Sequence, residues 1–564
     1  MTSKYYLSGN NKQTHTSASS YKAQGITWLL ENTLSYDKTI DKHSFSVLLG
    51  QSAQRSSNSD LGGSRWNLVN VDKPSINYAT GDVVVDADGN ATVQHSVYGG
   101  PWAEHRLASL FARLDYNYDE RYILQFTVRR DGSSRFGANH KYGTFPSASL
   151  GWNIANEPYM KDVLPSWMSA AKLRMSWGKN GNERIGDFRY TVNNSMGNNY
   201  LFGKVASMSI GSKASGLPNP DLRWEESEQT DIGLDLGFLG GALTFSADYF
   251  NKRTNGMIIA MPIPGYVGET APLDNIGVME NRGVEMELGY KWDIADAHFS
   301  MKGNASYLHN ELIYLGNTIG YLSFDGVQGI QGGAVSRAQN GKPFPYYYGY
   351  KTDGVFQTIS EVNAYKSADG SLIQPKAKPG DVRFVDVDGD GKITPEDRTD
   401  IGNGTPTWTF GLDFNAAWRG LDLNLFFQGV SGVDVFDATH RNDVLAGNFP
   451  TWMLGRWTGP GTSNKYPILR LSDDVNWQVS DLYVCDGSYL RLKNIQLGYT
   501  LPQKWTEEIL VQRLRVYLMA ENLFTWTHYW GFDPEISSGG TSLGIDRGIY
   551  PQARTLTVGL NITL

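Results

Sequence analysis

The sequence predicts an all-β fold, a transmembrane antiparallel β-barrel, and three observations support this prediction. Apolar side chains alternate with polar or small ones, most clearly in the last segment, where Leu556, Val558, Leu560, Ile562 and Leu564 alternate with Thr, Gly and Asn residues. A strand has a side-chain period of two, so such a segment has one apolar and one polar face. Segments of this kind recur along the chain, and the connections between them alternate between short and long. These features are typical of outer-membrane barrels, which face lipid outside and water inside.

Fifteen segments carry the alternating pattern and are predicted to be strands. The clearest hairpin joins a segment that ends at Tyr118 to one that begins at Tyr122, across three polar residues. Short connections of this kind are common between antiparallel strands. The predicted strands cover residues 24–36, 44–51, 105–118, 122–131, 146–155, 171–179, 225–238, 242–252, 281–293, 297–310, 405–418, 421–430, 487–500, 512–526 and 552–564.

The lengths of the connections predict which side of the membrane each strand end faces. Short connections are expected at residues 37–43, 119–121, 156–170, 239–241, 294–296, 419–420 and 501–511. Longer ones are expected at residues 52–104, 132–145, 180–224, 253–280, 311–404, 431–486 and 527–551. Outer-membrane barrels have short periplasmic turns and long extracellular loops, so the C-terminus is expected in the periplasm. Residues 1–23 then form a leading loop or strand remnant, and residues 24–564 form the barrel.

Aromatic residues at strand ends agree with this sidedness. Eight of them lie beside the short connections: Tyr36, Tyr116, Tyr118, Tyr122, Tyr290, Trp292, Trp418 and Tyr499. Tyr and Trp are enriched at membrane–water interfaces, so these rings are predicted to form the inner aromatic girdle of the barrel. The alternative is an ordinary aromatic core of a soluble β protein.

One predicted strand, 487–500, breaks the alternation. Leu490 and Leu492 have even numbers, whereas Ile495 and Leu497 have odd numbers. An extra residue in one strand restores the facing of the side chains beyond it, so a β-bulge is predicted near Lys493–Asn494.

Composition excludes several classes of function. Lys and Arg number 50 against 58 Asp and Glu, and the net charge of −8 argues against a nucleic-acid-binding surface. The single cysteine, Cys485, excludes an intrachain disulfide and a cysteine metal cluster. No continuous apolar run reaches the ~18 residues that indicate a transmembrane helix. Nucleophile-elbow, zinc-protease and Walker motifs are absent from the sequence, so the chain is not expected to be an enzyme.

Seven segments carry a resemblance to a known family. They are Arg129–Phe136 (RRDGSSRF), Asn219–Glu225 (NPDLRWE), Asn281–Glu285 (NRGVE), Tyr348–Phe356 (YGYKTDGVF), Tyr489–Pro502 (YLRLKNIQLGYTLP), Leu514–Phe524 (LRVYLMAENLF) and Gly531–Glu535 (GFDPE). In this order and spacing they resemble the SusC/RagA family of TonB-dependent outer-membrane transporters. The resemblance covers the chain from about residue 24 to its C-terminal end.

The resemblance implies a barrel of about 22 strands with a plugged lumen, of which the fifteen predicted strands are the eighth to the last. It implies that the signal peptide, the TonB box, the plug and about seven strands lie outside this chain. It also implies an importer of oligosaccharides, or of peptides in some members, in the outer membrane of a Gram-negative bacterium. The implied partners are a SusD-type surface lipoprotein and the TonB complex, which acts through the missing N-terminal part.

An acidic loop within residues 311–404 predicts a calcium site. Its spacing is that of a twelve-residue EF-hand-type loop, with acids at the first, third and fifth positions, Gly391 at the sixth, a backbone carbonyl at the seventh and an acid at the twelfth. The predicted ligands are Asp386, Asp388, Asp390, Lys392 through its carbonyl, and Asp397. The expected role is structural, and the alternative is a solvated acidic turn.

Aromatic residues in the long loops are candidate substrate contacts, because flat sugar faces stack on aromatic rings. The predicted binding residues are Tyr346, Tyr348, Trp526, Tyr529 and Trp530. The alternative for each ring is packing within a loop or a place in the outer aromatic girdle.

Two other classes of function compete with the importer. One is a soluble or surface β-rich glycan-binding protein stabilised by calcium, and the other is a glycan-cleaving enzyme, which needs two carboxylates in a cleft. Only the importer accounts for an apolar face directed toward lipid. In a barrel made of residues 1–564 alone, the first and last strands would leave backbone N–H and C=O groups unpaired in lipid, which costs free energy. Residues 1–564 alone are therefore expected not to transport.

Overall fold

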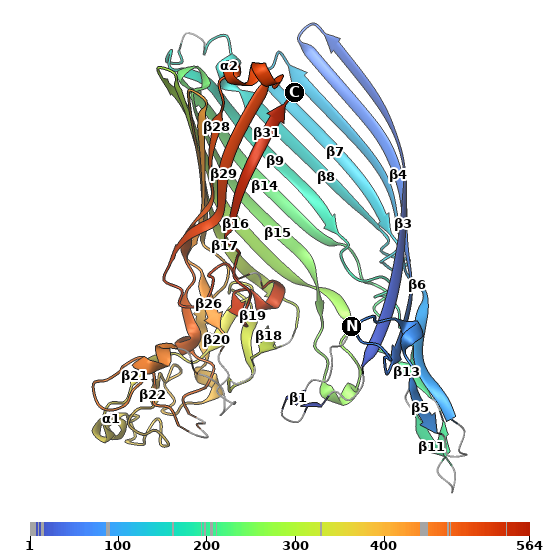
Figure 1. The fold of residues 1–564 in the computed structure, drawn as a ribbon, viewed down its shortest axis with the longest axis vertical. Helices are drawn as coiled ribbons and strands as arrows, with labels where there is room; N and C mark the ends of the chain where they lie inside the picture. The colour runs from blue at the N-terminus through green and yellow to red at the C-terminus, as the bar shows by residue number, and fades with distance from the viewer. Residues whose placement is uncertain are drawn as a thin grey trace.

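The structure, a computed structural model, has strands as its main elements, and most of them join one large sheet. It describes residues 7–8, 11–12, 16–85, 91–160, 163–192, 194–196, 199–202, 207–209, 211–317, 319–327, 330–439, 449, 451–470, 473, 475–536 and 538–564. The sheet has sixteen strands, fifteen of them on one continuous path, with β5 paired beside β6. All pairings along the path are antiparallel. The predicted barrel class is confirmed, and Figure 1 shows the path as a tall curved wall.

Each of the fifteen predicted strands corresponds to one strand of the path, in the same order. The path runs β3 (Ser17–Ile40), β4 (His43–Trp66), β6 (Ala91–Tyr118), β7 (Tyr122–Ser133), β8 (Tyr142–Asn153), β9 (Met168–Asn182), β14 (Glu225–Phe238), β15 (Leu243–Ala260), β16 (Leu273–Ile294), β17 (Ala297–Leu315), β24 (Trp408–Trp418), β25 (Leu421–Ser431), β28 (Tyr489–Thr500), β29 (Arg513–Thr527) and β31 (Thr555–Thr563).

The remaining elements are short and lie mostly in the connections. The strands are β1 (Leu7–Ser8), β2 (Asn11–Lys12), β5 (Asp82–Val85), β10 (Asn194–Met196), β11 (Tyr200–Phe202), β12 (Ser207–Ser209), β13 (Ser212–Ala214), β18 (Tyr321–Gly326), β19 (Ala334–Gln339), β20 (Tyr346–Gly349), β21 (Thr352–Val355), β22 (Val382–Phe384), β23 (Thr399–Gly402), β26 (Asp434–Asp437), β27 (Val484–Asp486) and β30 (Ile545–Asp546). The α-helices are α1 (Ile359–Ala364) and α2 (Gln503–Thr506). Among the described residues, no helix has the length and apolar character needed to cross a membrane.

The seven predicted short connections join successive strands of the path at one end of the wall, which also holds α2 and the C-terminus (Figure 1). In the turn between β6 and β7, Asp119 and Glu120 both have positive φ, of 52° and 54°. Two left-handed residues match the twist of a tight hairpin, so this connection needs no longer loop. The predicted placement of the seven connections at one end is therefore confirmed, but their lengths do not strictly alternate with the others, since residues 154–167 between β8 and β9 exceed residues 134–141 between β7 and β8.

The loop expected at 52–104 is the largest error in the predicted boundaries. Strand β4 continues to Trp66 and β6 begins at Ala91, so the connection between them is much shorter than expected. The β4 extension is rich in Ser and Gly, and the β6 extension is interrupted by Gly99, Gly100 and Pro101, so neither carries the regular apolar alternation on which the prediction relied. Backbone pairing defines them instead, and for the same reason β3 begins at Ser17 within the expected leading segment.

The two faces of the wall follow the predicted alternation. Residues directly opposite each other in an antiparallel pair share a face, and the register aligns Tyr36, Val47, Leu114 and Phe126 in one row across four strands. All four side chains are exposed and apolar or aromatic, as on a lipid-facing surface. Tyr36 and the other predicted girdle residues lie at the end of the wall that carries the short turns, in agreement with the girdle prediction.

The β-bulge predicted near Lys493–Asn494 is confirmed. Against β25, the pairing along β28 passes from Leu492 directly to Asn494, which leaves Lys493 as the extra residue; against β29 the register also shifts here, with Asn522 and Leu523 opposite Lys493. Leu490 and Leu497 therefore share the exposed face although their numbers differ in parity.

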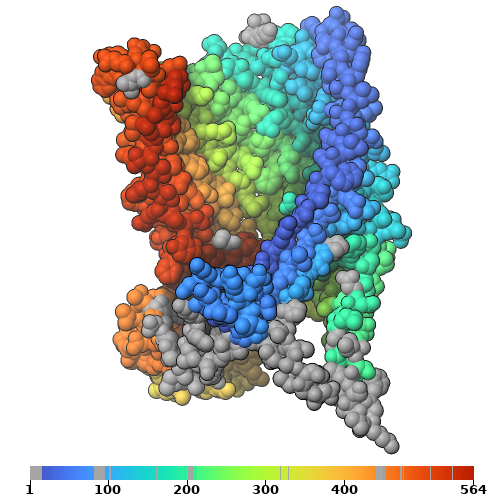
Figure 2. Space-filling view, turned by 45° about the vertical axis from the view of Figure 1, so that its right-hand side comes forward, coloured from blue at the N-terminus to red at the C-terminus, as the bar shows by residue number. Residues whose placement is uncertain are grey.

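The wall is open along one side. Within the described residues, β3 and β31 each pair with one strand only. Figure 2 shows these two margins, β3 in blue and β31 in red, with the inner face of the other strands visible between them.

At the end opposite the short turns, three long connections pack into one compact body, here called the lobe. It includes the four-stranded sheet β18–β19–β20–β23, the pair β21–β22, and the sheet β27–β26–β30 (Figure 1). Its main core joins residues far apart in the chain, among them Val335, Phe436, Val479 and Ile545. The lobe is thus a small protein core, whereas the wall has one face turned to its surroundings.

Candidate binding site and metal loop

The lobe holds its three connections together through buried polar contacts as well as its core. The Tyr347 hydroxyl group donates toward two backbone oxygens, that of Asp434 at 3.0 Å and that of Leu543 at 3.1 Å. Burial raises the pKa of Tyr347 above its usual value. The hydroxyl therefore stays protonated and continues to link segments that are far apart in the sequence.

The predicted metal ligands Asp386, Asp388 and Asp390 lie close together on the lobe. Carboxylate oxygens of the three lie within 4.8 Å of one another. The loop is folded around them: Asp386 accepts hydrogen bonds from the backbone N–H groups of Gly389 at 2.8 Å and Gly391 at 2.9 Å. Both glycines have positive φ, of 77° and 84°, which allows the chain to wrap around the carboxylates.

The twelfth loop position, Asp397, is fully buried and closes the loop. Its carboxylate accepts hydrogen bonds from the N–H groups of Val387 at 2.7 Å and Thr394 at 2.7 Å, so it joins the two ends of the loop. The backbone N–H of Lys392, the seventh loop residue, donates to the Asp390 carboxylate at 2.9 Å, which holds Lys392 in the turn beside the other predicted ligands. The structure thus brings the first, third and fifth positions together and uses the twelfth to hold the loop closed.

The electrostatics of the loop suit a cation. The backbone N–H of Asp390 lowers the pKa of Asp388, but burial and the carboxylates of Asp390, Asp397 and Asp386 outweigh it and raise this pKa above its usual value. Clustered carboxylates repel one another until a proton or a cation neutralises them. Hard oxygen ligands on a glycine-containing loop are the donor set that Ca²⁺ prefers, so the residues present fit that ion.

Two of the predicted substrate-contacting rings are buried in the lobe. Tyr346 is 1% exposed and donates to the side-chain oxygen of Gln339 at 2.7 Å. Tyr529 is 6% exposed and donates to the Asp546 carboxylate at 2.5 Å. Since solvent does not reach their faces, these two rings pack the lobe rather than meet a ligand directly.

The other three rings lie in different surroundings. The face of Tyr348 is covered by the Arg337 guanidinium, 3.2 Å from the ring centre. Trp530 is half-buried and donates to the Asp437 carboxylate at 2.8 Å. Trp526 is 53% exposed and stands opposite Leu490 on the outward face. This position agrees with the alternative prediction for Trp526, a place in the outer aromatic girdle. The five rings therefore do not form one binding surface.

A buried ion cluster that the sequence did not single out ties the last long connection to the wall. Arg491 is 2% exposed, and it contacts Asp533 at 2.5 Å and Glu535 at 2.8 Å. Lys493, the bulge residue, reaches Glu535 at 2.7 Å. Arg491 lies on the inward face of β28, and the acids belong to the GFDPE segment. A charged residue at an inward position of an apolar strand was the available signal for this cluster.

The inward face carries a polar hollow. Its volume is about 470 Å³, and its charged lining consists of Arg174, Asp248, Glu285 and Glu287. Arg174 lies 3.0 Å from Asp248 and 2.6 Å from Asp235, so it is held by two carboxylates. Three of the four charged lining groups are acids; Glu287 lies 3.0 Å from Lys302, whereas Glu285 is in no ion pair among the described contacts. This surface can bind hydroxyl or cationic groups of a hydrophilic solute.

Comparisons with known proteins agree with this architecture. The family model described as TonB dependent receptor-like, beta-barrel, matches residues 2–523. TonB-dependent receptor P3 of Formosa agariphila is 32% identical over 554 residues, which cover 95% of this chain and 52% of the relative. TonB-dependent receptor SusC of Bacteroides thetaiotaomicron is 31% identical over 469 residues, which cover 81% of this chain and 43% of the relative.

The solved structure of the RagAB peptide transporter is also similar. Its TM-score to this structure is 0.79 at 25% sequence identity, covering 97% of this chain and 56% of that chain. The chain spans about half the length of the curated relatives it matches. The matched relatives are receptors and transporters, which agrees with the prediction that the chain is not an enzyme.

Proposed function

The chain belongs to the TonB-dependent receptor-like β-barrel family of the outer membrane, and from this premise we propose that it forms most of the wall of an importer for hydrophilic solutes. One observation carries the proposal: the wall has an exposed apolar outward face and a polar inward face with a hollow of about 470 Å³. A solute that cannot dissolve in lipid needs such a lining to cross the membrane. A soluble glycan-binding protein would bury the apolar face, so this alternative is not favoured.

The proposal includes further strands and a plug that complete the lumen. Backbone groups left unpaired in hydrocarbon cost several kcal/mol each. The edges of β3 and β31 therefore require partners, and about seven strands would close a barrel of the SusC/RagA type. Western blotting of native outer membranes with an antibody against residues 311–404 tests this. A band well above 62.6 kDa is expected, and a band at that mass would contradict a longer chain and direct the search to a second one.

The proposed cargo is an oligosaccharide or a peptide, and the proposed partners are a SusD-type surface lipoprotein and the TonB complex. The similarity to SusC and to the RagAB peptide transporter supports this range of cargo and does not select between the two. The acidic hollow supports a hydroxyl-rich or cationic cargo. Uptake of labelled oligosaccharides and peptides by cells that express the native protein distinguishes them, and loss of uptake after addition of a protonophore is expected.

A matched pair of variants tests the inner surface. Glu285→Gln with Glu287→Gln removes charge from the hollow, whereas Glu226→Gln with Glu228→Gln removes charge from the outward face of the same wall. The inner pair is expected to change the KM for uptake at equal protein abundance in the membrane, and the outer pair is expected to leave it unchanged. Equal effects of both pairs would contradict a role for the hollow.

We further propose that the acidic loop binds Ca²⁺ and orders the lobe. Three clustered carboxylates and the closed geometry at Asp397 support this role. Isothermal titration of the native protein with Ca²⁺ after EDTA treatment is expected to show one site. Asp386→Asn with Asp390→Asn is expected to abolish it, whereas the control Asp353→Asn, on the same lobe, should retain it. Binding that survives the double variant would contradict the site.

A further inference from the structure

A group of cations stands on the outward face of the wall near its extracellular end. The register aligns Trp28, Arg55 and Arg106 in one row across β3, β4 and β6. Arg106 lies on the same face of β6 as Leu114, since both have even numbers and no bulge separates them. Arg130 on β7 stands opposite Leu110 on this face, and Lys141 precedes β8. Arg55, Arg106, Arg130 and Lys141 are all exposed and are here called the basic patch.

The basic patch is not neutralised by its neighbours. Glu104 pairs with both Arg55, at 3.1 Å, and Arg106, whose Nε donates to it at 2.7 Å. Within the described part of the chain, Glu104 is the only carboxylate in an ion pair with any of the four cations. Arg130 lies over the Tyr142 ring at 5.3 Å. One carboxylate against four cations leaves a strong positive excess on this surface.

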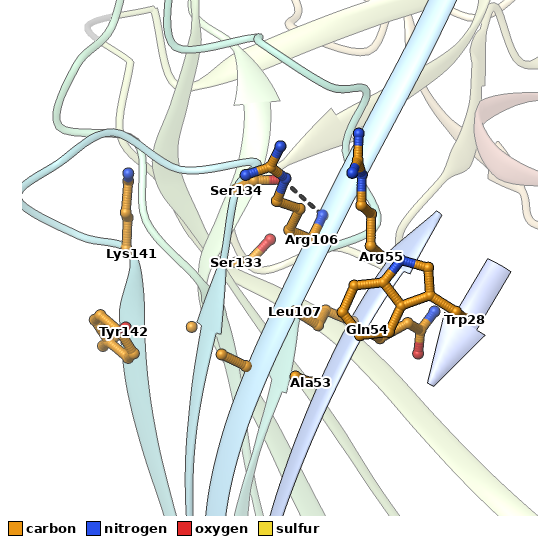
Figure 3. Close-up of a pocket in the computed structure, with 12 residues that line it drawn as sticks. Trp28, Ala53, Gln54, Arg55, Arg106, Leu107, Ser133, Ser134, Lys141 and Tyr142 are labelled. Carbon is orange, nitrogen blue, oxygen red and sulfur yellow. Dashed lines mark hydrogen bonds between the residues drawn. The ribbon is translucent and has the colours of Figure 1, made fainter. Parts of the chain in front are cut away.

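Two adjoining hollows lie beside the basic patch. The first has a volume of about 440 Å³ and includes Trp28, Arg55, Arg106 and Lys141 in its lining (Figure 3). The second, of about 550 Å³, continues past Leu30, Leu110 and Arg130, and shares Ala53, Ala108 and Tyr142 with the first.

The hollows arise because small residues meet in one row. Ala53, Ala108 and Gly132 stand side by side on three neighbouring strands, between the large side chains of Leu30 and Tyr142. A methyl group on Gly132 would lie 2.4 Å from the Tyr142 ring, so the position has no room for a larger residue. The result is a mainly apolar groove that lies between the row of Arg55 and Arg106 on one side and the row of Arg130 on the other.

The height of Arg55 and Arg106 matches a lipid headgroup. From Val47 near the short turns to Arg55, eight residues at roughly 3.4 Å each span ~27 Å along the strand. Strand tilt of about 40° reduces this to ~20 Å, which is close to the thickness of the apolar band of such barrels. Arginine side chains at that level extend toward the polar interface and bind phosphate oxygens in a bidentate manner.

Charge distinguishes this part of the wall from the next. On the outward faces of β9 and β14, at the same end, Lys179 lies 3.9 Å from Glu226 and 4.0 Å from Glu228, so acids outnumber the cation there. We propose that the basic patch and its groove bind a phosphate-bearing lipid of the outer leaflet. The phosphate lies among Arg55, Arg106, Arg130 and Lys141, and an acyl chain follows the groove over Ala53, Ala108 and Gly132. A free anion would make no use of the groove.

Native mass spectrometry of the full-length protein, purified from outer membranes in detergent, tests the proposal. Monophosphoryl lipid A is the probe, and phosphatidylcholine, whose phosphate is balanced by its own choline, is the comparison of zero net charge. Arg106→Gln with Arg130→Gln is expected to weaken lipid A binding roughly tenfold, since each cation near an anionic lipid contributes measurably to binding. The control Lys179→Gln, on the outward face at the same end, is expected to leave binding within about twofold. Equal binding by the double variant and the wild type would overturn the proposal.

A second arm separates a lipid from free phosphate. Ala108→Phe fills the groove without changing charge and is expected to weaken lipid A binding, whereas excess inorganic phosphate is expected not to displace the lipid. Displacement by phosphate together with normal binding by Ala108→Phe would overturn the lipid assignment. Folding of each variant is checked by heat-modifiable mobility on gels. Should the double variant not fold, wild-type binding must fall between about 50 and about 500 mM NaCl, and salt-independent binding would also overturn the proposal.

Discussion

The wall and the lobe keep their apolar side chains away from water in opposite ways. On the wall, Leu34 is 70% exposed and Leu114 44% exposed, so lipid must cover them. In the lobe, Val335, Phe436 and Val479 are fully buried by other parts of the chain. The wall therefore depends on which face each residue occupies, whereas the lobe depends on how well its residues fill space. The two regions should fail for different reasons when the sequence is changed.

A change of facing in the wall is expected to have the largest effect. Deleting Gln496 shifts the rest of β28 by one residue and turns the buried Arg491 toward lipid, where a cation costs several kcal/mol. Deleting Lys493 removes only the bulge residue and keeps Leu490, Leu492 and Ile495 on the outward face. Heat-modifiable gel mobility of outer-membrane protein is the measurement. We expect assembled protein for the Lys493 deletion and none for the Gln496 deletion, and the reverse result would refute the assigned bulge.

The contrast also explains what the sequence can predict. All fifteen wall strands follow from a period of two, because lipid outside and water inside impose that period on each strand. The extensions of β4 and β6 lie beyond the apolar band, and no such constraint acts on them. This is why residues 52–66 and 91–104 were expected to be loop.

The lobe offers no comparable pattern. Its core joins Val335, Phe436, Val479 and Ile545, which are distant in sequence and belong to short strands and turns. The acidic loop was predictable because its ligands are local, within twelve residues. The Arg491 cluster and the burial of Tyr346 and Tyr529 depend on tertiary packing, and local spacing does not reveal such contacts.

A cavity in the lobe is expected to have the next largest effect. Phe436 stacks on Tyr483 with ring centres 5.6 Å apart and meets Tyr347 edge-on at 5.7 Å. Phe436→Ala should destabilise the lobe by about 3–5 kcal/mol. Limited proteolysis is expected to cut within residues 311–404 while the wall keeps its heat-modifiable mobility. Loss of the folded wall as well would show that the two regions do not unfold separately.

Removal of Ca²⁺ is expected to have a smaller effect on the stability of the lobe, and to reverse the sign with which that stability depends on pH. Calcium at about 100 times its dissociation constant would stabilise the lobe by about 2.7 kcal/mol. The pKa of Asp388 is raised in the folded loop. Without calcium, the folded loop is therefore less stable at pH values where Asp388 is charged, and acidification through the raised pKa makes it more stable again. With calcium the sign is opposite, because protonation competes with the ion.

Thermal unfolding of the lobe, followed by proteolysis at a series of pH values, measures this reversal. Acidification from neutral pH should lower the midpoint temperature in calcium and raise it in EDTA. Asp388→Asn should remove most of the difference between the two conditions. Parallel pH dependences with and without calcium would contradict the role of Asp388 as a ligand.

The smallest expected effect compares identical substitutions in the two regions. Val479→Ala in the lobe and Val47→Ala on the wall remove the same two methyl groups and lose similar transfer free energy. In the lobe the neighbours are fixed and leave a cavity, which adds about 1 kcal/mol at ~24 cal/mol per Å³ of void. On the wall, mobile lipid chains fill the space, so this addition is absent. Unfolding by urea in lipid vesicles, with separate probes on lobe and wall, measures both, and equal losses would mean that the wall is packed like a protein core rather than solvated by lipid.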